Sequence, residues 1–98
     1  MILVKKVKNK IEIKGHALYD DYGKDIVCSA VSSIVTTTIN GIISIDEDAI
    51  LYQVSDGKIV IRIKKDDKIT TKLIDNMIDL LKDLSSSYPD NIKIEEGV

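Results

Sequence analysis

Alternating apolar and charged positions open the chain and predict two short strands. The first runs over Ile2–Val7 and the second over Lys10–Lys14, where Ile11 and Ile13 alternate with charged neighbours. An alternation with a period of two is typical of a strand that buries one face. We expect a turn at Asn9 to join the two strands into a hairpin.

A second pair of apolar segments surrounds an Asp-Gly step and predicts another hairpin. These segments are Leu51–Val54 and Lys58–Ile63, and Ser55-Asp56-Gly57 separates them. Asp-Gly favours a type I′ turn, because both central residues of that turn need a positive φ angle. The isoleucines at every second position of the later segment would then share one face.

Two longer segments carry apolar residues at helical spacing. Asp25, a favoured N-cap, precedes residues 26–44, although several side chains there are β-branched and intrinsically poor in helices. The expected apolar positions of this first helix are Ile26, Val27, Ala30, Val31 and Ile34. A second, more clearly amphipathic helix is expected from about Asp67 to Ser85. Its expected apolar face consists of Ile69, Leu73, Ile74, Met77, Ile78, Leu80, Leu81 and Leu84.

The order of these elements predicts the fold class. It is strand, strand, helix, strand, strand, helix, and Ile92–Ile94 fit one further strand. Hairpin connections pair strands antiparallel, and helices then cover the sheet. We therefore predict an α+β fold in which two antiparallel hairpins form one sheet covered by two helices. Residues 1–98 are expected to form a single domain, because this length supports one modest core.

Charge and hydropathy narrow the classes of partner. Fourteen basic and sixteen acidic residues give a formal net charge of −2, which argues against nucleic acid as the main partner. A local basic group at Lys5, Lys6, Lys8 and Lys10 is interpreted as a solvated strand face. The order of the first ten residues does not fit a signal peptide, and no apolar run was expected to reach membrane-spanning length. We predict a cytoplasmic protein without a membrane partner, and we expect no direct nucleic-acid binding.

The chain holds one histidine, His16, and one cysteine, Cys28. Such a pair cannot build a disulfide framework or a zinc site, so no metal or cofactor is expected. If Asp25 caps the helix, Cys28 lies in its first turn, where the helix dipole stabilises a thiolate. The loop after Gly15 returns directly to that helix, so the two side chains can face each other. An ordinary core cysteine and a surface histidine remain open at this point.

Two sequence blocks resemble a known family. They are Gly15-His16-Ala17 and Tyr22-Gly23-Lys24-Asp25-Ile26-Val27-Cys28-Ser29-Ala30-Val31-Ser32. Together they resemble the signature of the ribosomal-processing cysteine proteases, the Prp family. Weaker similarity continues through Asn40-Gly41 and Tyr88-Pro89. Leu18 departs from the family, whose members often carry a small residue there, and Asp20 and Asp21 add negative charge to the loop.

The resemblance implies roles for individual residues. Cys28 would be the nucleophile and His16 the base, while Asp25 would orient His16, cap the helix, or do both. Gly15 and Ser32 would support the pair. Residues 17–24 would form a lid over the substrate, and four of them are expected to contact it: Leu18, Tyr19, Tyr22 and Gly23.

The resemblance also implies a substrate and a state of assembly. The expected activity is a cysteine endopeptidase that removes the short N-terminal extension of large-subunit ribosomal protein number twenty-seven, a step needed for ribosome assembly. Family members form homodimers, so a homodimer is expected. The alternatives are a non-enzymatic ribosome-assembly or protein-binding module and a redox-sensing thiol.

Overall fold

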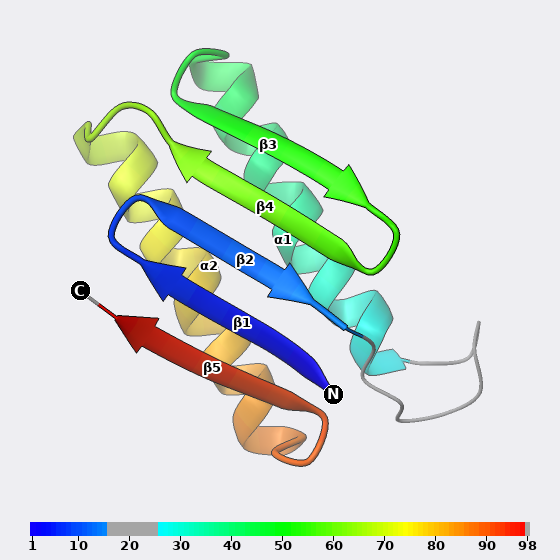
Figure 1. The fold of residues 1–98 in the computed structure, drawn as a ribbon. Coiled ribbons are helices and arrows are strands. Elements are labelled where there is room, and N and C mark those ends of the chain that lie inside the picture. The colour runs from blue at the N-terminus through cyan, green and yellow to red at the C-terminus, as the bar shows by residue number, and fades with distance from the viewer. Residues whose placement is uncertain (16–25, 98) are drawn as a thin grey trace.

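The computed structural model describes residues 1–15 and 26–97. Within them the chain forms five strands and two helices, so the predicted α+β class is confirmed (Figure 1). The elements in chain order are β1 (Ile2–Val7), β2 (Lys10–Lys14), α1 (Ile26–Ile45), β3 (Ile50–Ser55), β4 (Lys58–Ile63), α2 (Lys68–Ser87) and β5 (Ile92–Gly97).

The five strands form one sheet in the order β3-β4-β2-β1-β5. Both predicted hairpins are present, and β2 joins them by pairing antiparallel with β4. The further strand, whose direction was not predicted, is β5, and it lies parallel to β1 at one edge of the sheet. The reason is the connection: β5 follows helix α2, and a long helical connection can return the chain beside an earlier strand in the same direction.

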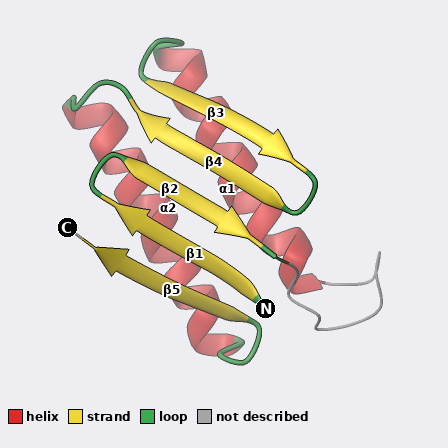
Figure 2. Ribbon diagram, viewed as in Figure 1, coloured by secondary structure: helices red, strands yellow, loops and turns green. Residues whose placement is uncertain are grey.

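Both helices cover the same face of the sheet, and the opposite face carries no helix (Figure 2). The core lies between these two layers. Val4, Ile11 and Ile61 from the sheet and Met77 and Leu81 from α2 are all fully buried there. Buried and more exposed residues alternate along β1 and β2, which is the period-two pattern expected of a sheet with one buried face.

Helix α1 forms although its sequence is rich in β-branched residues. Its buried residues are Val27, Val31, Val35, Ile39 and Ile42. They recur every three or four positions, so packing against the sheet and α2 overrides their weak intrinsic helix propensity. Ile26, which we expected on the apolar face, is instead 55% exposed, because it lies at the first position of the helix.

Contrary to the expectation from the sequence, α1 is long and apolar enough to cross a membrane by length and composition. Its 20 residues have a mean hydropathy of 1.7. Five of its apolar residues are buried in the core and Cys28, Ile34 and Ile43 pack against that core, whereas Ile26 and Ile45 are exposed. Ser29, Ser32, Thr36 and Asn40 occupy exposed positions of the same helix, as on a core helix that presents one polar side.

Helix α2 begins one residue after its N-cap, Asp67. The Asp67 carboxylate accepts hydrogen bonds from the Thr70 backbone N–H at 2.8 Å and from the Thr70 hydroxyl at 3.1 Å. Two residues of the predicted apolar face are exposed instead, Ile69 at 54% and Leu80 at 42%. They lie at the border of the apolar face of α2, so they do not pack in the core between this helix and the sheet.

One of the two hairpin turns differs from the predicted type. Type I′ at Asp56-Gly57 is wrong, since only Gly57 of the two residues has a positive φ, at 71°. In the first hairpin the predicted turn at Asn9 is confirmed, because Lys8, with φ 41°, and Asn9 form the loop. The registers Val7–Lys10 and Ser55–Lys58 nevertheless make both loops two residues long.

Candidate active site

Gly15 fixes the point at which the chain leaves β2. Its backbone N–H donates a hydrogen bond of 2.9 Å to the carbonyl of Gly57, in the turn between β3 and β4. Its φ is +98°, and a Cβ atom there would lie 2.3 Å from the carbonyl oxygen of Met1. A side chain at this position is therefore excluded both by backbone conformation and by space. The absence of a side chain at Gly15 thus lets the Met1 backbone approach this strand end.

Cys28 is the third residue of α1, so it lies in the first helical turn as predicted. Its side chain is half-buried and packs against the core without belonging to its fully buried part. The apolar residues around it, Val27 and Val31, are buried. The backbone N–H groups of a first helical turn point beyond the helix, where the dipole creates a positive potential. That environment suits an anionic group bound at the end of the helix, such as a developing oxyanion.

A pocket of about 200 Å³ opens beside Cys28. Strands β1 and β2 supply one wall, α1 another, and the β3–β4 hairpin the third. The lining residues are Ile2, Ile13, Gly15, Cys28, Val31, Ser32, Val54, Ser55, Gly57, Lys58 and Ile59. The pocket thus combines apolar walls with one thiol, and it is large enough for an amino-acid side chain.

The pocket brings together three of the predicted site residues: Gly15, Cys28 and Ser32. Ser32 is exposed and lies one turn after Cys28 on the same helix. Six other predicted residues lie outside the described residues, so their roles remain predictions. They are His16, Leu18, Tyr19, Tyr22, Gly23 and Asp25.

Sequence reasoning missed the contribution of the β3–β4 hairpin. Val54, Gly57 and Lys58 line the pocket although they stand about thirty residues after Cys28 in the sequence. The register between β2 and β4, which pairs Lys14 with Lys58, brings this turn beside Gly15. Each hairpin could be recognised locally, but the pairing between them is non-local and leaves no periodic signal in the sequence.

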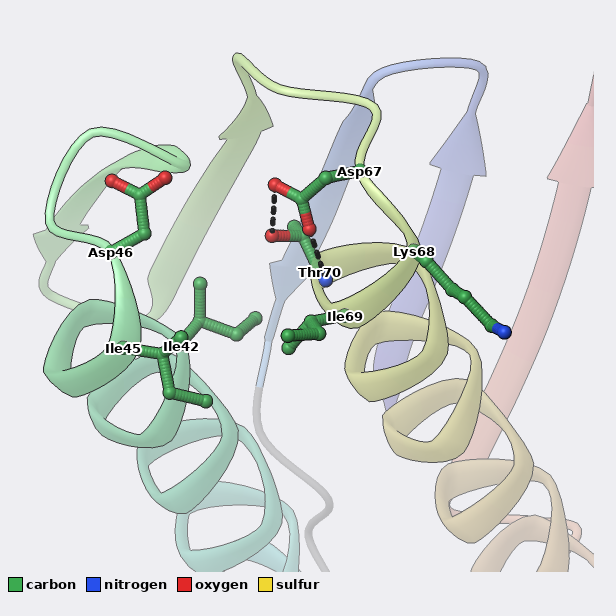
Figure 3. Close-up of a pocket in the computed structure, with 7 residues that line it drawn as sticks. All are labelled: Ile42, Ile45, Asp46, Asp67, Lys68, Ile69 and Thr70. Atoms are coloured by element: carbon green, nitrogen blue, oxygen red, sulfur yellow. Dashed lines mark hydrogen bonds between the residues drawn. The ribbon is translucent and has the colours of Figure 1, made fainter.

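A larger hollow of about 520 Å³ lies at the other end of α1 (Figure 3). Ile42 and Ile45 from α1 face Ile69 from α2 across it, while the Asp67 carboxylate caps α2 through Thr70. This hollow contains no thiol, hydroxyl–imidazole pair or other activated nucleophile among the described residues. We therefore place the candidate chemistry at the smaller pocket, where Cys28 is.

The acidic side chain at this far end is engaged by its neighbours. Asp46 accepts hydrogen bonds from Lys65 Nζ at 2.8 Å and from the Asp48 backbone N–H at 3.0 Å, and both hold the pKa of its carboxyl below the usual range. The same contact raises the pKa of Lys65. Among residues 1–15 and 26–97, no group of three or more His, Cys, Asp or Glu side chains is placed to hold a metal ion.

Comparison with protein families and known proteins gives one consistent result. The family described as cysteine protease Prp matches residues 1–93. The ribosomal processing cysteine protease Prp of Mycoplasma genitalium is 33% identical over 106 residues, covering 98% of this chain and 96% of the relative. The protein of the same name from Mycoplasma pneumoniae is 33% identical over 103 residues, covering 98% of this chain and 95% of the relative.

Solved structures share the fold. The ribosomal processing protease Prp from S. aureus, in complex with a covalently linked product peptide, matches with a TM-score of 0.93 and 24% identity over 99% of this chain and all of that one. The same protease with a substrate peptide matches with a TM-score of 0.87 and 23% identity, again over 99% of this chain and all of that one. At these identities the likeness concerns the arrangement of the sheet and helices.

Proposed function

This chain belongs to the cysteine protease Prp family, and we propose its function from that membership. We propose that it is an endopeptidase that removes the short N-terminal extension of large-subunit ribosomal protein number twenty-seven. Relatives 33% identical over almost their whole length are named ribosomal processing cysteine proteases. The observation that carries the proposal is the position of Cys28, a half-buried thiol in the first turn of α1 at the wall of a pocket.

The reaction that we propose is nucleophilic catalysis by a Cys28–His16 dyad. His16 takes the thiol proton, and the Cys28 sulfur attacks the carbonyl carbon of the scissile peptide bond. When the tetrahedral intermediate collapses, the C–N bond breaks, the proton passes to the leaving amine, and a thioester remains on Cys28. Water then attacks the thioester carbonyl, releases the acid product and returns the thiol.

Two features support the placement of this chemistry. The backbone N–H groups of the first turn of α1 are suited to bind the oxyanion that forms during attack. His16 follows Gly15 directly, and consecutive Cα atoms lie about 3.8 Å apart. Gly15 is held against Gly57 and lines the same pocket as Cys28, so the residue that precedes the proposed base in the sequence lies beside the thiol.

We propose that the extension peptide lies against the β3–β4 hairpin with one apolar side chain in the pocket. Val31, Val54 and Ile59 give this pocket apolar walls. The S. aureus protease of the same fold was solved with substrate and product peptides, which supports a peptide as the partner. Leu18, Tyr19, Tyr22 and Gly23 belong to the proposed lid over that peptide, and Asp25 is proposed to orient His16 or to cap α1.

The experiment that tests this function uses a synthetic peptide that spans the junction of the extension. Wild-type protein is expected to cut it once, as seen by mass spectrometry, and the Cys28→Ala variant is expected to bind it uncut. Absence of cleavage with retained peptide binding would favour a non-enzymatic binding module. Cleavage by Cys28→Ala would exclude the proposed nucleophile.

We further propose that the protein acts in the cytoplasm as a homodimer. Strand β3 lies at the edge of the sheet and exposes large apolar side chains on both of its faces, Leu51 at 54% and Tyr52 at 44%. Exposed apolar edge strands favour association with a second chain. Sedimentation analysis of the wild type and of the Leu51→Lys, Tyr52→Lys variant tests the dimer. A wild type that sediments as a monomer would contradict it.

A further inference from the structure

The face of the sheet that carries no helix has a charge opposite to that of the whole chain. Residues paired across strands point to the same side of a sheet, so the register identifies the members of this face. Its cations are Lys5, Lys10, Lys14, Lys58, Arg62 and Lys93. Its carboxylates are Glu12 and Glu95. Six cations and two carboxylates give this open face a formal charge of +4, whereas the whole chain carries −2.

The expectation of a simple solvated lysine strand at the N-terminus is therefore incomplete. Lys5 and Lys10 lie on the open face, but Lys6 pairs with Ile11 and so points to the helix side, and Lys8 lies in the turn. The other cations of the open face come from β4 and β5, far along the sequence. These cations lie on one face only because the strands pair in the folded sheet. The negative net charge of the whole chain gives no indication of this positive face.

The cations form a positive field around one acidic centre. The Nζ atoms of Lys10, Lys58 and Lys14 lie 3.5, 3.6 and 3.8 Å from the Glu12 carboxylate. Partial burial alone would raise the pKa of Glu12, but the attraction of Lys58, Lys10 and Lys14 outweighs it and lowers the pKa. One carboxylate shared among three lysines leaves an excess of positive charge.

Two cations of the face make no close ion pair with a carboxylate, although Lys5 stands opposite Glu12 and Glu95 in the strand register. Within the described ranges 1–15 and 26–97, no ion pair of 4.0 Å or less joins Lys5 or Arg62 to a carboxylate, and both side chains are exposed. The cations occur on four adjacent strands, β5, β1, β2 and β4, which cover roughly 14 Å across the sheet. That area is wide enough to contact several phosphates at once.

From this charge distribution we propose that the open face of the sheet binds the phosphate backbone of structured RNA. A second copy of the chain does not fit, because it would bring one +4 face against another. RNA is chosen over other polyanions because the family processes ribosomal protein, so this choice rests on the proposed function. The face would hold the protease on an RNA-rich particle while the pocket at Cys28 takes the peptide.

The side chains of the open face favour binding of double-stranded RNA without preference for its base sequence. Single-stranded nucleic acid is usually held by aromatic side chains that stack on bases. Of the described tyrosines, Tyr52 points to the helix side, and Tyr88 lies after α2, so neither belongs to the open face. Lysines and an arginine without aromatic neighbours contact phosphates, which position a protein but carry no sequence information.

The test measures binding of an RNA duplex of about 20 base pairs by fluorescence anisotropy over a salt series. If about four phosphates are contacted, the affinity should fall roughly a hundredfold between about 50 and about 200 mM salt. The Lys5→Ala, Arg62→Ala variant should reduce the slope of log K against log salt by about 2. The matched control is Lys68→Ala, Lys72→Ala, which removes two exposed lysines from α2 and should leave the slope unchanged.

The outcomes separate this proposal from the protease function. Peptide cleavage should be the same in the Lys5, Arg62 variant and in wild type, because neither residue lines the Cys28 pocket. RNA binding that is absent at low salt, or that falls equally in both double variants, would overturn the proposal. Binding to vesicles of anionic phospholipid without binding to RNA would also overturn it and would indicate a membrane surface instead.

Discussion

The two ends of helix α1 differ in a way that shows what makes a site. Residue 28 and residue 45 are separated by roughly 25 Å along the helix. The first end has a pocket of about 200 Å³ and holds Cys28, whereas the second has a hollow of about 520 Å³ in which the polar side chains Asp46 and Asp67 are already hydrogen-bonded. The smaller pocket has the reactive group and the positive end of the helix dipole. A candidate active site is therefore identified by its nucleophile and the surroundings of that nucleophile. The volume of a pocket alone does not identify such a site.

The largest expected effect comes from removing the thiol. Cys28→Ala should reduce the rate of peptide cleavage by roughly four to six orders of magnitude, because no other group at that end forms the covalent intermediate. The matched control is Ser44→Ala in the last turn of α1, where the hydroxyl only contacts the Gly41 carbonyl at 2.7 Å. Single-turnover cleavage assays compare them. A comparable loss in Ser44→Ala would contradict the assignment of chemistry to the Cys28 end.

The next effect concerns the proposed base. His16→Ala should lower kcat by about 10²–10⁴, the usual contribution of a positioned general base. It should also slow alkylation of Cys28 by iodoacetamide at pH 7, since the thiolate loses its cationic partner. Mass spectrometry of the alkylated protein measures the second effect. Equal alkylation rates in variant and wild type would show that His16 does not activate Cys28 and would contradict the proposed dyad.

Alanine substitutions at two glycines, one near each end of α1, are expected to change the stability of the fold in opposite directions. Gly15→Ala places a Cβ 2.3 Å from the Met1 carbonyl oxygen at φ +98°, so it should destabilise the fold by roughly 1–3 kcal/mol and reduce cleavage. Gly41→Ala, near the other end of α1, meets no atom within 4 Å and should instead stabilise by about 0.5–1 kcal/mol. Urea unfolding of both variants measures this. Equal shifts of the same sign would show that Gly15 is under no greater steric constraint than Gly41.

A smaller effect is expected at the end without chemistry. Asp67→Ala removes the carboxylate that caps α2 and should cost about 1 kcal/mol of stability. Because Asp67 lies at the far hollow, kcat/KM for the peptide should not change at a temperature where the variant is folded. Thermal unfolding and cleavage assays on one preparation test both statements. A selective loss of kcat/KM would show that the far hollow takes part in catalysis.

The smallest effect is the pH dependence at Asp46. The pKa of this carboxyl is lowered in the folded protein, so its contribution is present above the ordinary value of 3.8 and is lost as pH falls through the lowered value. Lys65 has the opposite sign: its pKa is raised, so its contribution is lost as pH rises through a value above 10.5. Both groups are exposed, so the change should be small. Asp46→Asn should flatten the acid limb of the stability curve slightly, as measured by urea unfolding at several pH values.

The order and type of the elements could be predicted because their signals are local. Alternation along β1 and β2 and the helical spacing in α2 depend on residues close in sequence. The type of turn at Asp56-Gly57 could not be predicted, since the φ angle of Asp56 is not set by residue type alone. The β-branched residues of α1, such as Val35, were an ambiguous signal that only packing against the sheet resolves.

The candidate site was predictable only in part. Cys28 followed from its position three residues after Asp25, a residue type favoured before a helix, and Gly15 followed from the end of a strand. The pocket wall at Val54 and Lys58 depends on the pairing of β2 with β4, and the charge of the open face depends on the complete strand order. These are non-local pairings between segments whose own sequences do not specify one another. Their consequences for binding therefore appear only in the folded molecule.

The parallel pairing of β1 with β5 has a consequence for how the protein is made. Ile2 pairs with Ile92, and the Ile2 N–H donates to the Asn91 carbonyl at 2.8 Å. The first strand therefore gains its outer neighbour only after residue 92 has been synthesised. Contacts of such long sequence separation slow folding, because the loop must close before they form. Ile2 also lines the pocket at Cys28, and the Met1 carbonyl lies against Gly15. The pocket should thus acquire its final shape only after the C-terminal strand has paired, late in the folding of the chain.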